Sequence, residues 1–252
     1  MTCLLWVNDA RRVRARMRHH ATTHFTNRLL MKLPHRVRQK FLASCERVDL
    51  TDSDILAEPG EPILYVYFPT ESSISMLASV DGHSNLEVGL VGNEGMIGTP
   101  LILGVAVSSL RAVVRGEGSA IRMTAACFRR ELKQSAAVGR ELNRYLYVVM
   151  DQFAQAVTCS RFHLLESRLA RWLLMTHDRA HSDMFHVTHE SLSLILGVRR
   201  VGVTKAATAL QNKNLISYTR GDIVITDRKG LEKASCECYA NDKAAYERIM
   251  SK

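Results

Sequence analysis

The chain has 252 residues, of which 46% are hydrophobic and 23% charged, and its formal net charge is +9. This composition is typical of a globular protein of one or two domains and excludes fibrous, low-complexity and largely disordered chains. No uncharged apolar run approaches the roughly 18 to 20 residues of a membrane span, and six irregularly spaced cysteines do not resemble a secreted disulfide framework, so we expect a cytoplasmic protein without membrane contact.

The positive charge is concentrated at the two ends of the chain. Residues 1–40 and 161–252 are basic, whereas residues 41–160 are acidic. Such segregation favours a polyanionic partner, because a uniform excess of charge mainly affects solubility.

Residues 1–26 contain five arginines between positions 11 and 18 and show no sustained apolar period. They are expected to form a basic, disordered arm without a function of its own. Met17 is an alternative start, so the sequence leaves open whether residues 1–16 belong to the protein.

Residues 27–135 are predicted to form a β-rich sensor domain. Apolar residues at helical spacing between Asn27 and Leu50 predict two short helices, and short β-rich stretches separated by glycine turns follow up to Met123. Many short strands without a long helix favour a small barrel or jelly roll. The expected strands are 63–68, 73–80, 86–91, 110–114 and 119–123.

Residues 136–160 are predicted to form one long helix. Five apolar residues recur there at coiled-coil spacing, which indicates a seam that needs a partner. Two partners remain open: the β-rich domain of the same chain, or a second copy of the helix in a homodimer. The proposed dimer residues are Leu142, Leu146, Val149, Phe153 and Ala156.

Residues 161–240 are predicted to form a winged helix-turn-helix, and 241–252 a C-terminal tail. Thr188 is a candidate N-cap, Gly197 ends the first helix, and Arg199–Leu210 form a second helix with a basic outer face. Two short β-runs, 215–219 and 223–226, joined at Arg220, Gly221 and Asp222 form the wing. The candidate DNA contacts are His189, Arg199, Arg200, Gly202, Thr204, Lys205 and Arg220.

In motifs and in domain order, residues 27–240 resemble the Crp/Fnr family of bacterial transcription regulators. The resemblance is carried by five stretches: 58–62, 89–95, 168–174, 196–203 and 236–239. It implies an α+β fold with an N-terminal jelly-roll (cyclic-nucleotide-binding-like) barrel, a long dimerisation helix and a C-terminal winged helix-turn-helix. It also implies that Arg200 reads a base and that Lys205 contacts DNA. The acidic residue that often follows that arginine is replaced by Val201, so the preferred operator is expected to differ.

The ligand pocket implied by the resemblance is degenerate. Family members that bind cyclic nucleotides have Gly-Glu and Arg-Ser pairs where this chain has Gly98, Thr99, Ser108 and Ser109. The positive charge that would pair with the cyclic phosphate is therefore missing. Arg111 reaches the pocket only if its loop is rearranged.

No metal or other cofactor is expected from the sequence. Cys236 and Cys238 lack a second ligand pair, and a redox role for them stays a minor hypothesis. The expected Fe–S thiolates are absent from the N-terminal region. A metal-binding set is likewise not expected from His177, His181, His186 and His189.

These features together predict a transcription regulator rather than an enzyme. We expect a homodimer that reads a two-fold symmetric operator in double-stranded DNA, with RNA polymerase as a further possible partner. No catalytic constellation is present in the sequence. Two alternatives remain: a non-specific architectural nucleic-acid binder, and a regulator that binds a cyclic nucleotide in a rearranged pocket. The effector, the operator, the target genes and the sign of regulation stay open.

Overall fold

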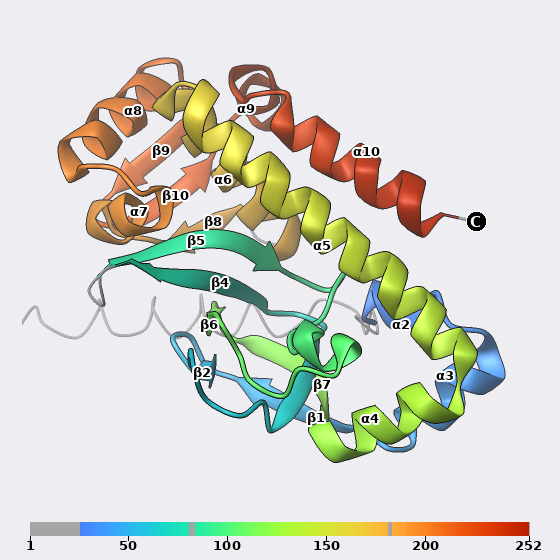
Figure 1. The fold of residues 1–252 in the computed structure, drawn as a ribbon. Helices are drawn as coiled ribbons and strands as arrows, with labels where there is room; N and C mark the ends of the chain where they lie inside the picture. Colours follow the sequence, from blue (N-terminus) through green and yellow to red (C-terminus); the bar gives the residue numbers. More distant parts are fainter. Residues whose placement is uncertain (1–25, 81–83, 181–182, 252) are drawn as a thin grey trace, which may run out of the picture.

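The computed structural model describes residues 26–80, 84–180 and 183–251 (Figure 1). The basic arm predicted for residues 1–26 lies, except for its last residue, outside the described residues. None of the helices in the described ranges is long and apolar enough to span a membrane.

The N-terminal half is a β-rich domain with two antiparallel sheets, which confirms the predicted architecture, although the sheets do not close into one barrel. One sheet has the order β1-β7-β3 and the other β2-β6-β4-β5. Helices α2 and α3 precede them. The elements are α2 (Arg28–Met31), α3 (His35–Leu42), β1 (Glu46–Leu50), β2 (Ile55–Ala57), β3 (Tyr65–Pro69), β4 (Ser73–Val80), β5 (Ser84–Val91), the 3-10 helix η1 (Thr99–Leu103), β6 (Arg111–Arg115) and β7 (Gly118–Thr124).

Strands β1 and β2 were not predicted from the sequence. Residues Glu46–Leu50 lie at the end of a stretch that the sequence predicts as helical, but they pair with β7, with Val48 opposite Ala120. Leu50 is buried and packs in a cluster with Ile74 of the second sheet. This pairing is non-local, so the periodicity of the short segment does not reveal it.

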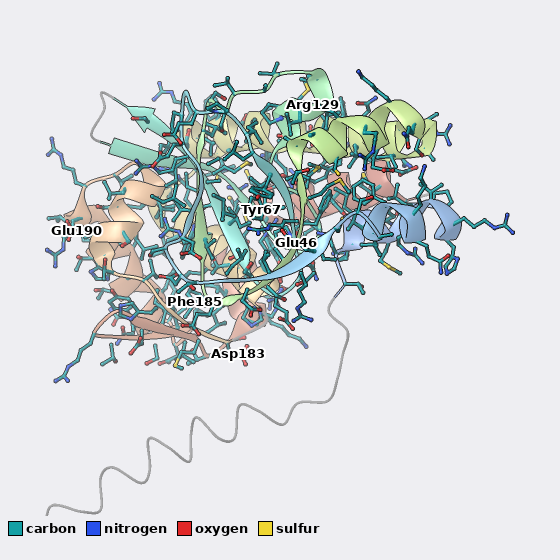
Figure 2. The ribbon with its side chains drawn as sticks, turned by 90° about the horizontal axis from the view of Figure 1, so that it is seen from below. Glu46, Tyr67, Arg129, Asp183, Phe185 and Glu190 are labelled. Carbon is teal, nitrogen blue, oxygen red and sulfur yellow. The ribbon has the colours of Figure 1, made fainter. Side chains whose placement is uncertain are left out.

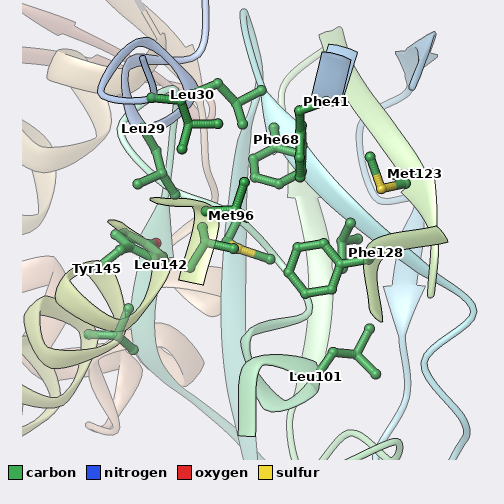
Figure 3. Close-up of a cluster of buried hydrophobic side chains, with 14 of the residues drawn as sticks. Leu29, Leu30, Phe41, Phe68, Met96, Leu101, Met123, Phe128, Leu142 and Tyr145 are labelled. Atoms are coloured by element: carbon green, nitrogen blue, oxygen red, sulfur yellow. The ribbon is translucent and has the colours of Figure 1, made fainter. Parts of the chain in front are cut away.

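A larger core joins the first sheet to helices that are distant in the sequence (Figure 3). Phe41 of α3 meets Phe68 of β3 edge to face, with ring centroids 5.6 Å apart. Phe128 of α4 (Ala125–Gln134) and Leu142 of α5 (Ala136–Phe162) complete this core. The long helix α5 is therefore held firmly by the β-rich domain, since each buried large apolar side chain contributes roughly 1.5 to 3 kcal/mol.

The predicted helix seam belongs to this same core. Leu142 and Val149 are buried in it, and Phe153 packs against both clusters of the β-rich domain. Leu146 and Ala156 are partly buried. Leu142, Val149 and Phe153 therefore contact their own chain, as the first of the two alternatives predicts, and the pairing of this seam with a second copy stays a prediction.

The C-terminal half contains α6 (Leu165–Ala180), β8 (Met184–His186), α7 (His189–Leu196), α8 (Arg200–Asn212), β9 (Ile216–Thr219), β10 (Asp222–Ile225), α9 (Arg228–Ala234) and α10 (Cys238–Met250). It has its own apolar core, in which α6 packs against α7 and α8. The predicted tail 241–252 is wrong up to Met250, because these residues continue α10. This helix lies alongside α5 (Figure 1), and Tyr246 and Met250 enter the core of the β-rich domain.

Candidate nucleic-acid interface

The helix-turn-helix formed by α7 and α8 begins and turns as the sequence predicts. The Thr188 side chain accepts a hydrogen bond from the backbone N–H of Ser191 at 3.1 Å and so caps α7. Gly197 ends α7 with φ +63°, a left-handed conformation that glycine adopts without steric cost. Helix α8 begins three residues later, at Arg200.

The inner face of α8 fixes its position on the domain. Val203, Ala206, Ala207 and Leu210 are all buried against α6 and α7. This spacing of three and four residues leaves the opposite face of the helix free for a partner. Figure 1 shows α8 at the outer edge of the C-terminal half.

The outer face of α8 carries the predicted DNA contacts. Arg199, Arg200, Thr204 and Lys205 are exposed there. Val201 is 67% exposed on the same face, although the sequence analysis did not select it. An exposed apolar side chain beside arginines suits contact with a thymine methyl group. No side chain caps α8, and the N–H of Gly202 in its first turn donates to the Arg199 carbonyl at 2.8 Å.

The cations on this face have no acidic partner within the part of the chain that the structure describes. Among the ion pairs of the described residues, none includes Arg199, Arg200, Lys205 or Arg220. By contrast, several cations elsewhere in the domain pair with carboxylates: Arg171, Arg179, Lys213, Arg228 and Lys243. The outer face of α8 and the wing therefore keep a positive field that an external polyanion can neutralise.

The wing is the hairpin of β9 and β10. Its two-residue loop, Arg220 and Gly221, has φ +53° and +95°, as a tight hairpin turn with two left-handed residues requires. Arg220 is exposed at the tip. A Cβ at Gly221 would lie 2.5 Å from the His186 ring, so strand β8 also restricts this position to glycine.

His189 does not have the geometry predicted for a phosphate contact. Its ring stacks on Tyr218 of β9 with centroids 4.5 Å apart, and Nδ1 lies 3.1 Å from the Thr204 hydroxyl. Nε2 is buried without a hydrogen-bond partner among the described residues. Burial, and then the nearby Arg200, lower the pKa of His189. The ring therefore joins the wing to α8 in its neutral form.

Gly202 is also not an open approach for DNA. A Cβ at this position would lie 3.0 Å from Cδ2 of Leu165 in α6. The glycine therefore allows α8 to pack closely on α6, and the reason for this residue is internal.

The predicted ligand pocket is a small cavity of about 140 Å³ in the β-rich domain. Gly98, Thr99, Ser108 and Ser109 line it together with apolar side chains and Phe153 of α5, and none of its lining residues is charged. Arg111 is not among them, because its Nε donates a hydrogen bond to Glu58 at 2.7 Å. The structure thus brings four of the five predicted pocket residues together and leaves out the arginine.

The predicted histidine group is dispersed in the described residues. His177 pairs with Asp183 at 2.6 Å and His186 with Asp222 at 2.8 Å, while His189 stacks on Tyr218. His181 lies outside the described residues. Each of the three described rings thus has a separate partner.

The two halves of the chain meet where α6 and α7 pack on β5. Trp172 Nε1 donates a hydrogen bond to Glu87 at 2.8 Å, and Arg179 pairs with Glu94 at 2.7 Å. A cavity of about 420 Å³ lies beside the first contact, lined by β5, α5, α6 and α7. Burial raises the pKa of the Glu87 carboxyl.

Residues 167–234 match the Crp-like helix-turn-helix domain family. The fold is similar to solved regulators of the Crp/Fnr family, including one assigned to that family from Eubacterium rectale (TM-score 0.66, 16% identity, 82% of this chain and 96% of that chain). Another of these is a transcriptional regulator of the same family from Thermus thermophilus (0.63, 20%, 75% and 98%), and a further similar structure is FixK2 from Bradyrhizobium japonicum (0.64, 14%, 76% and 98%). The comparison with curated proteins finds no match.

Proposed function

We propose that this chain, which carries a Crp-like helix-turn-helix domain on the Crp/Fnr fold, is a homodimeric transcription regulator that reads a two-fold symmetric operator. The observation that carries the proposal is the outer face of α8, where exposed cations without acidic partners surround an exposed apolar side chain. This combination suits the major groove, in which base edges, thymine methyl groups and flanking phosphates are all within reach of one helix.

The exposed residues divide into two kinds of contact. Arg200 and Val201, in the first turn of α8, are assigned to base edges: the guanidinium donates two hydrogen bonds to a guanine, and the valine meets a thymine methyl. Lys205 and, at the tip of the wing, Arg220 are assigned to phosphates. Arg199 and Thr204 flank the base-reading turn. His189 acts indirectly by fixing the wing against α8.

We assign the dimer surface to a stripe of α5 that is distinct from the predicted seam. Four residues of the stripe are exposed, namely Tyr147, Met150, Ala154 and Val157. Their spacing of three, four and three residues is that of a two-helix seam. Neither the β-rich domain nor α10 covers them, so a second copy of α5 is the fitting partner.

For the sensor pocket we propose a role other than the usual binding of cyclic AMP. Its lining contains no charged side chain, and the nearest predicted arginine is engaged by Glu58. Enclosing a phosphate without a cation is unfavourable, because burying an unpaired charge costs several kcal/mol or more. A small neutral ligand, or none, fits about 140 Å³ of mainly apolar space.

The test is the selection of bound sites from random duplex DNA by the full chain, with Arg200→Ala in parallel. A matched control is Arg129→Ala, since Arg129 is an exposed arginine of α4 on a different side of the molecule from Glu190 of α7 (Figure 2). We expect a two-fold consensus for the parent and the control. Loss of a bidentate guanine contact costs about 1 to 3 kcal/mol of discrimination, so Arg200→Ala should lose preference at one base pair of each half-site while keeping non-specific binding.

A different result would favour the architectural alternative. If the parent binds duplex DNA with a steep salt dependence but enriches no consensus, even with cell extract added to supply an effector, specific reading is wrong. Equal consensus sequences for the parent and Arg200→Ala would instead remove this residue from the base-reading set.

A further inference from the structure

Four side chains of metal-ligand type converge where α5, α6 and α10 meet. They are Cys159 in the last turn of α5, His163 directly after that helix, and Cys236 and Cys238 at the start of α10. Their ligand atoms all lie within 4.8 Å of one another. The three cysteines are free thiols and form a buried cluster of their own, and His163 is partly buried beside them.

The distances within this group fit the corners of a tetrahedron. The Sγ atoms of Cys159 and Cys236 are 3.5 Å apart, and Sγ of Cys238 is 3.4 Å from Nδ1 of His163. A tetrahedral zinc ion with Zn–S bonds of about 2.3 Å and Zn–N bonds of about 2.1 Å sets its ligands about 3.6 to 3.8 Å apart. Two of the six separations are therefore within a few tenths of an ångström of these values, and the others, at no more than 4.8 Å, exceed them by at most about 1.2 Å.

The backbone holds the four ligands in two pairs that are distant in the sequence. Cys159 and His163 are four residues apart, and the helix-end hydrogen bond from His163 N–H to the Cys159 carbonyl places both on one side of α5. Cys236 and Cys238 flank Glu237, the N-cap residue of α10. Packing of α10 against α5 brings the two pairs together, which makes the site a product of the tertiary fold.

The surroundings of the group are suited to a bound cation with three thiolates. Such a zinc site carries one net negative charge. The mostly buried guanidinium of Arg171 interacts electrostatically with Cys159 and Cys236, and its Nε has no hydrogen-bond partner among the described residues. Gln155 donates a hydrogen bond to Sγ of Cys238 at 2.8 Å. Both are the kind of outer contacts that orient and balance thiolate ligands.

We propose that Cys159, His163, Cys236 and Cys238 bind one Zn²⁺ ion in a structural site. Three soft thiolates and one imidazole form a ligand set typical of zinc and unsuited to magnesium or calcium, which prefer oxygen. Convergence on a single point favours one ion over an iron–sulfur cluster, whose thiolates each bind a different iron. All four protein positions are filled, so the ion holds no open coordination site for catalysis.

The ion would link the end of α5 and the residue after it to the start of α10, next to the junction between α5 and the C-terminal half. Only His163 and Leu164 separate α5 from α6. One ligand pair lies on α5 and this short link, and the other lies just before α10 and on its first residue. The site therefore restrains the orientation of α6 relative to α5. Zinc binding itself does not depend on the proposed DNA-binding function.

The test begins with metal analysis of the purified full chain after incubation with Zn²⁺ under reducing conditions and removal of excess metal. We expect about one zinc per chain. Cys238→Ser and His163→Ala should each weaken zinc binding at least tenfold, because loss even of outer contacts typically costs about 10- to 100-fold. The control Cys127→Ser changes a cysteine of α4 that lies outside the group and should retain the ion.

Cobalt substitution provides a readout that does not depend on the variants folding. Co²⁺ bound by the parent should give thiolate charge-transfer absorption and the strong visible bands of tetrahedral coordination. A folded parent chain that binds neither Zn²⁺ nor Co²⁺ would overturn the proposal. So would iron with cluster absorption in place of zinc, or a disulfide between Cys159 and Cys236 that forms equally well in the presence of zinc.

Discussion

At the scale of single residues, several positions in the C-terminal half serve the interface without facing it. Gly202 allows α8 to approach Leu165, and His189 joins Tyr218 of the wing to Thr204 of α8. Their residue types at the predicted interface suggested direct DNA contact. Their contacts instead lie within the domain and involve α6, the wing and α8, on which Arg200 is exposed.

The wing turn gives a prediction at this scale. Gly221→Ala should destabilise the protein by more than the roughly 1 to 2 kcal/mol that a left-handed alanine costs, because its Cβ would also meet His186 at 2.5 Å. The control is Gly116→Ala, where φ is +79° and nothing lies within 4 Å of the added carbon, so only the backbone cost applies. Urea unfolding measures both, and equal losses would contradict the role given to His186.

At the scale of elements, contacts between helices and strands decide which face of each helix is buried. Helix α5 has two apolar stripes of similar spacing, one in the core of the β-rich domain and one exposed. Periodicity reports both, but it cannot distinguish the stripe that meets the sheet from the one left for a second chain. Similarly, α6 meets β5 through Trp172 and Glu87, a contact that neither segment reveals alone.

The contact between α6 and β5 predicts a pH effect. Burial raises the pKa of Glu87 above its unfolded value, so the stability that this group contributes is complete below about pH 4 and is lost as pH rises through the folded pKa. Glu87→Gln removes the ionisation and keeps an acceptor for Trp172. Its Tm relative to the parent should therefore be higher at pH 8 than at pH 5.

The control for this effect is Glu117→Gln, at an exposed glutamate after β6. Its Tm difference from the parent should not change between the two pH values. A Glu87→Gln difference that is also independent of pH would show that this carboxyl does not change its charge in the folded protein within that range.

At the scale of the whole molecule, the exposed stripe of α5, the outer face of α8 and the Cys–His group lie on helices that are connected by packing through α6 and α10. Helix α10 belongs to this set of helices, because it starts at Cys238 and ends in the core of the β-rich domain at Met250. These helices connect the α5 stripe, which is suited to a second copy, with the outer face of α8, which is suited to DNA. We therefore expect dimer formation and operator binding to be lost together.

Met150→Glu tests this connection. A carboxylate in the middle of an apolar seam, facing its own copy, should convert the dimer to a monomer in sedimentation analysis and weaken binding to the full operator more than to a half-site. Leu64→Glu is the control, since Leu64 is 69% exposed but lies before β3, away from α5. A dimer that persists in both Met150→Glu and Val157→Glu would place the interface elsewhere.

The proposed zinc ion is also expected to affect the whole molecule, and this prediction rests on the proposed DNA-binding function. Chelation of the ion should lower the Tm of the full chain and weaken operator binding, because the junction between α5 and α6 becomes less restrained. Addition of Zn²⁺ should restore both, but not in Cys238→Ser. If Zn²⁺ binds but its removal leaves operator affinity unchanged, the zinc site is supported. Its proposed role in DNA binding is then wrong.

The sequence by itself determined the features that depend on local spacing. These include the cap at Thr188, the helix end at Gly197, the inward and outward faces of α8 and the tight wing turn, which the structure shortens by placing Asp222 in β10, and all follow from neighbours within a few residues. The structure also has the domain order that the resemblance implies, and its strands β3 to β7 overlap the predicted β-rich segments.

Only the tertiary structure decided which distant segments meet. It paired β1 with β7, placed the predicted α5 seam against the sheet, and brought Cys159 and His163 to Cys236 and Cys238. The pairing of β1 with β7 and the contacts within the Cys–His group join residues roughly 70 to 80 positions apart, and the α5 seam meets strands that precede it by tens of positions. Local periodicity carries no information about such pairs, because their free energy arises only when the whole chain has packed.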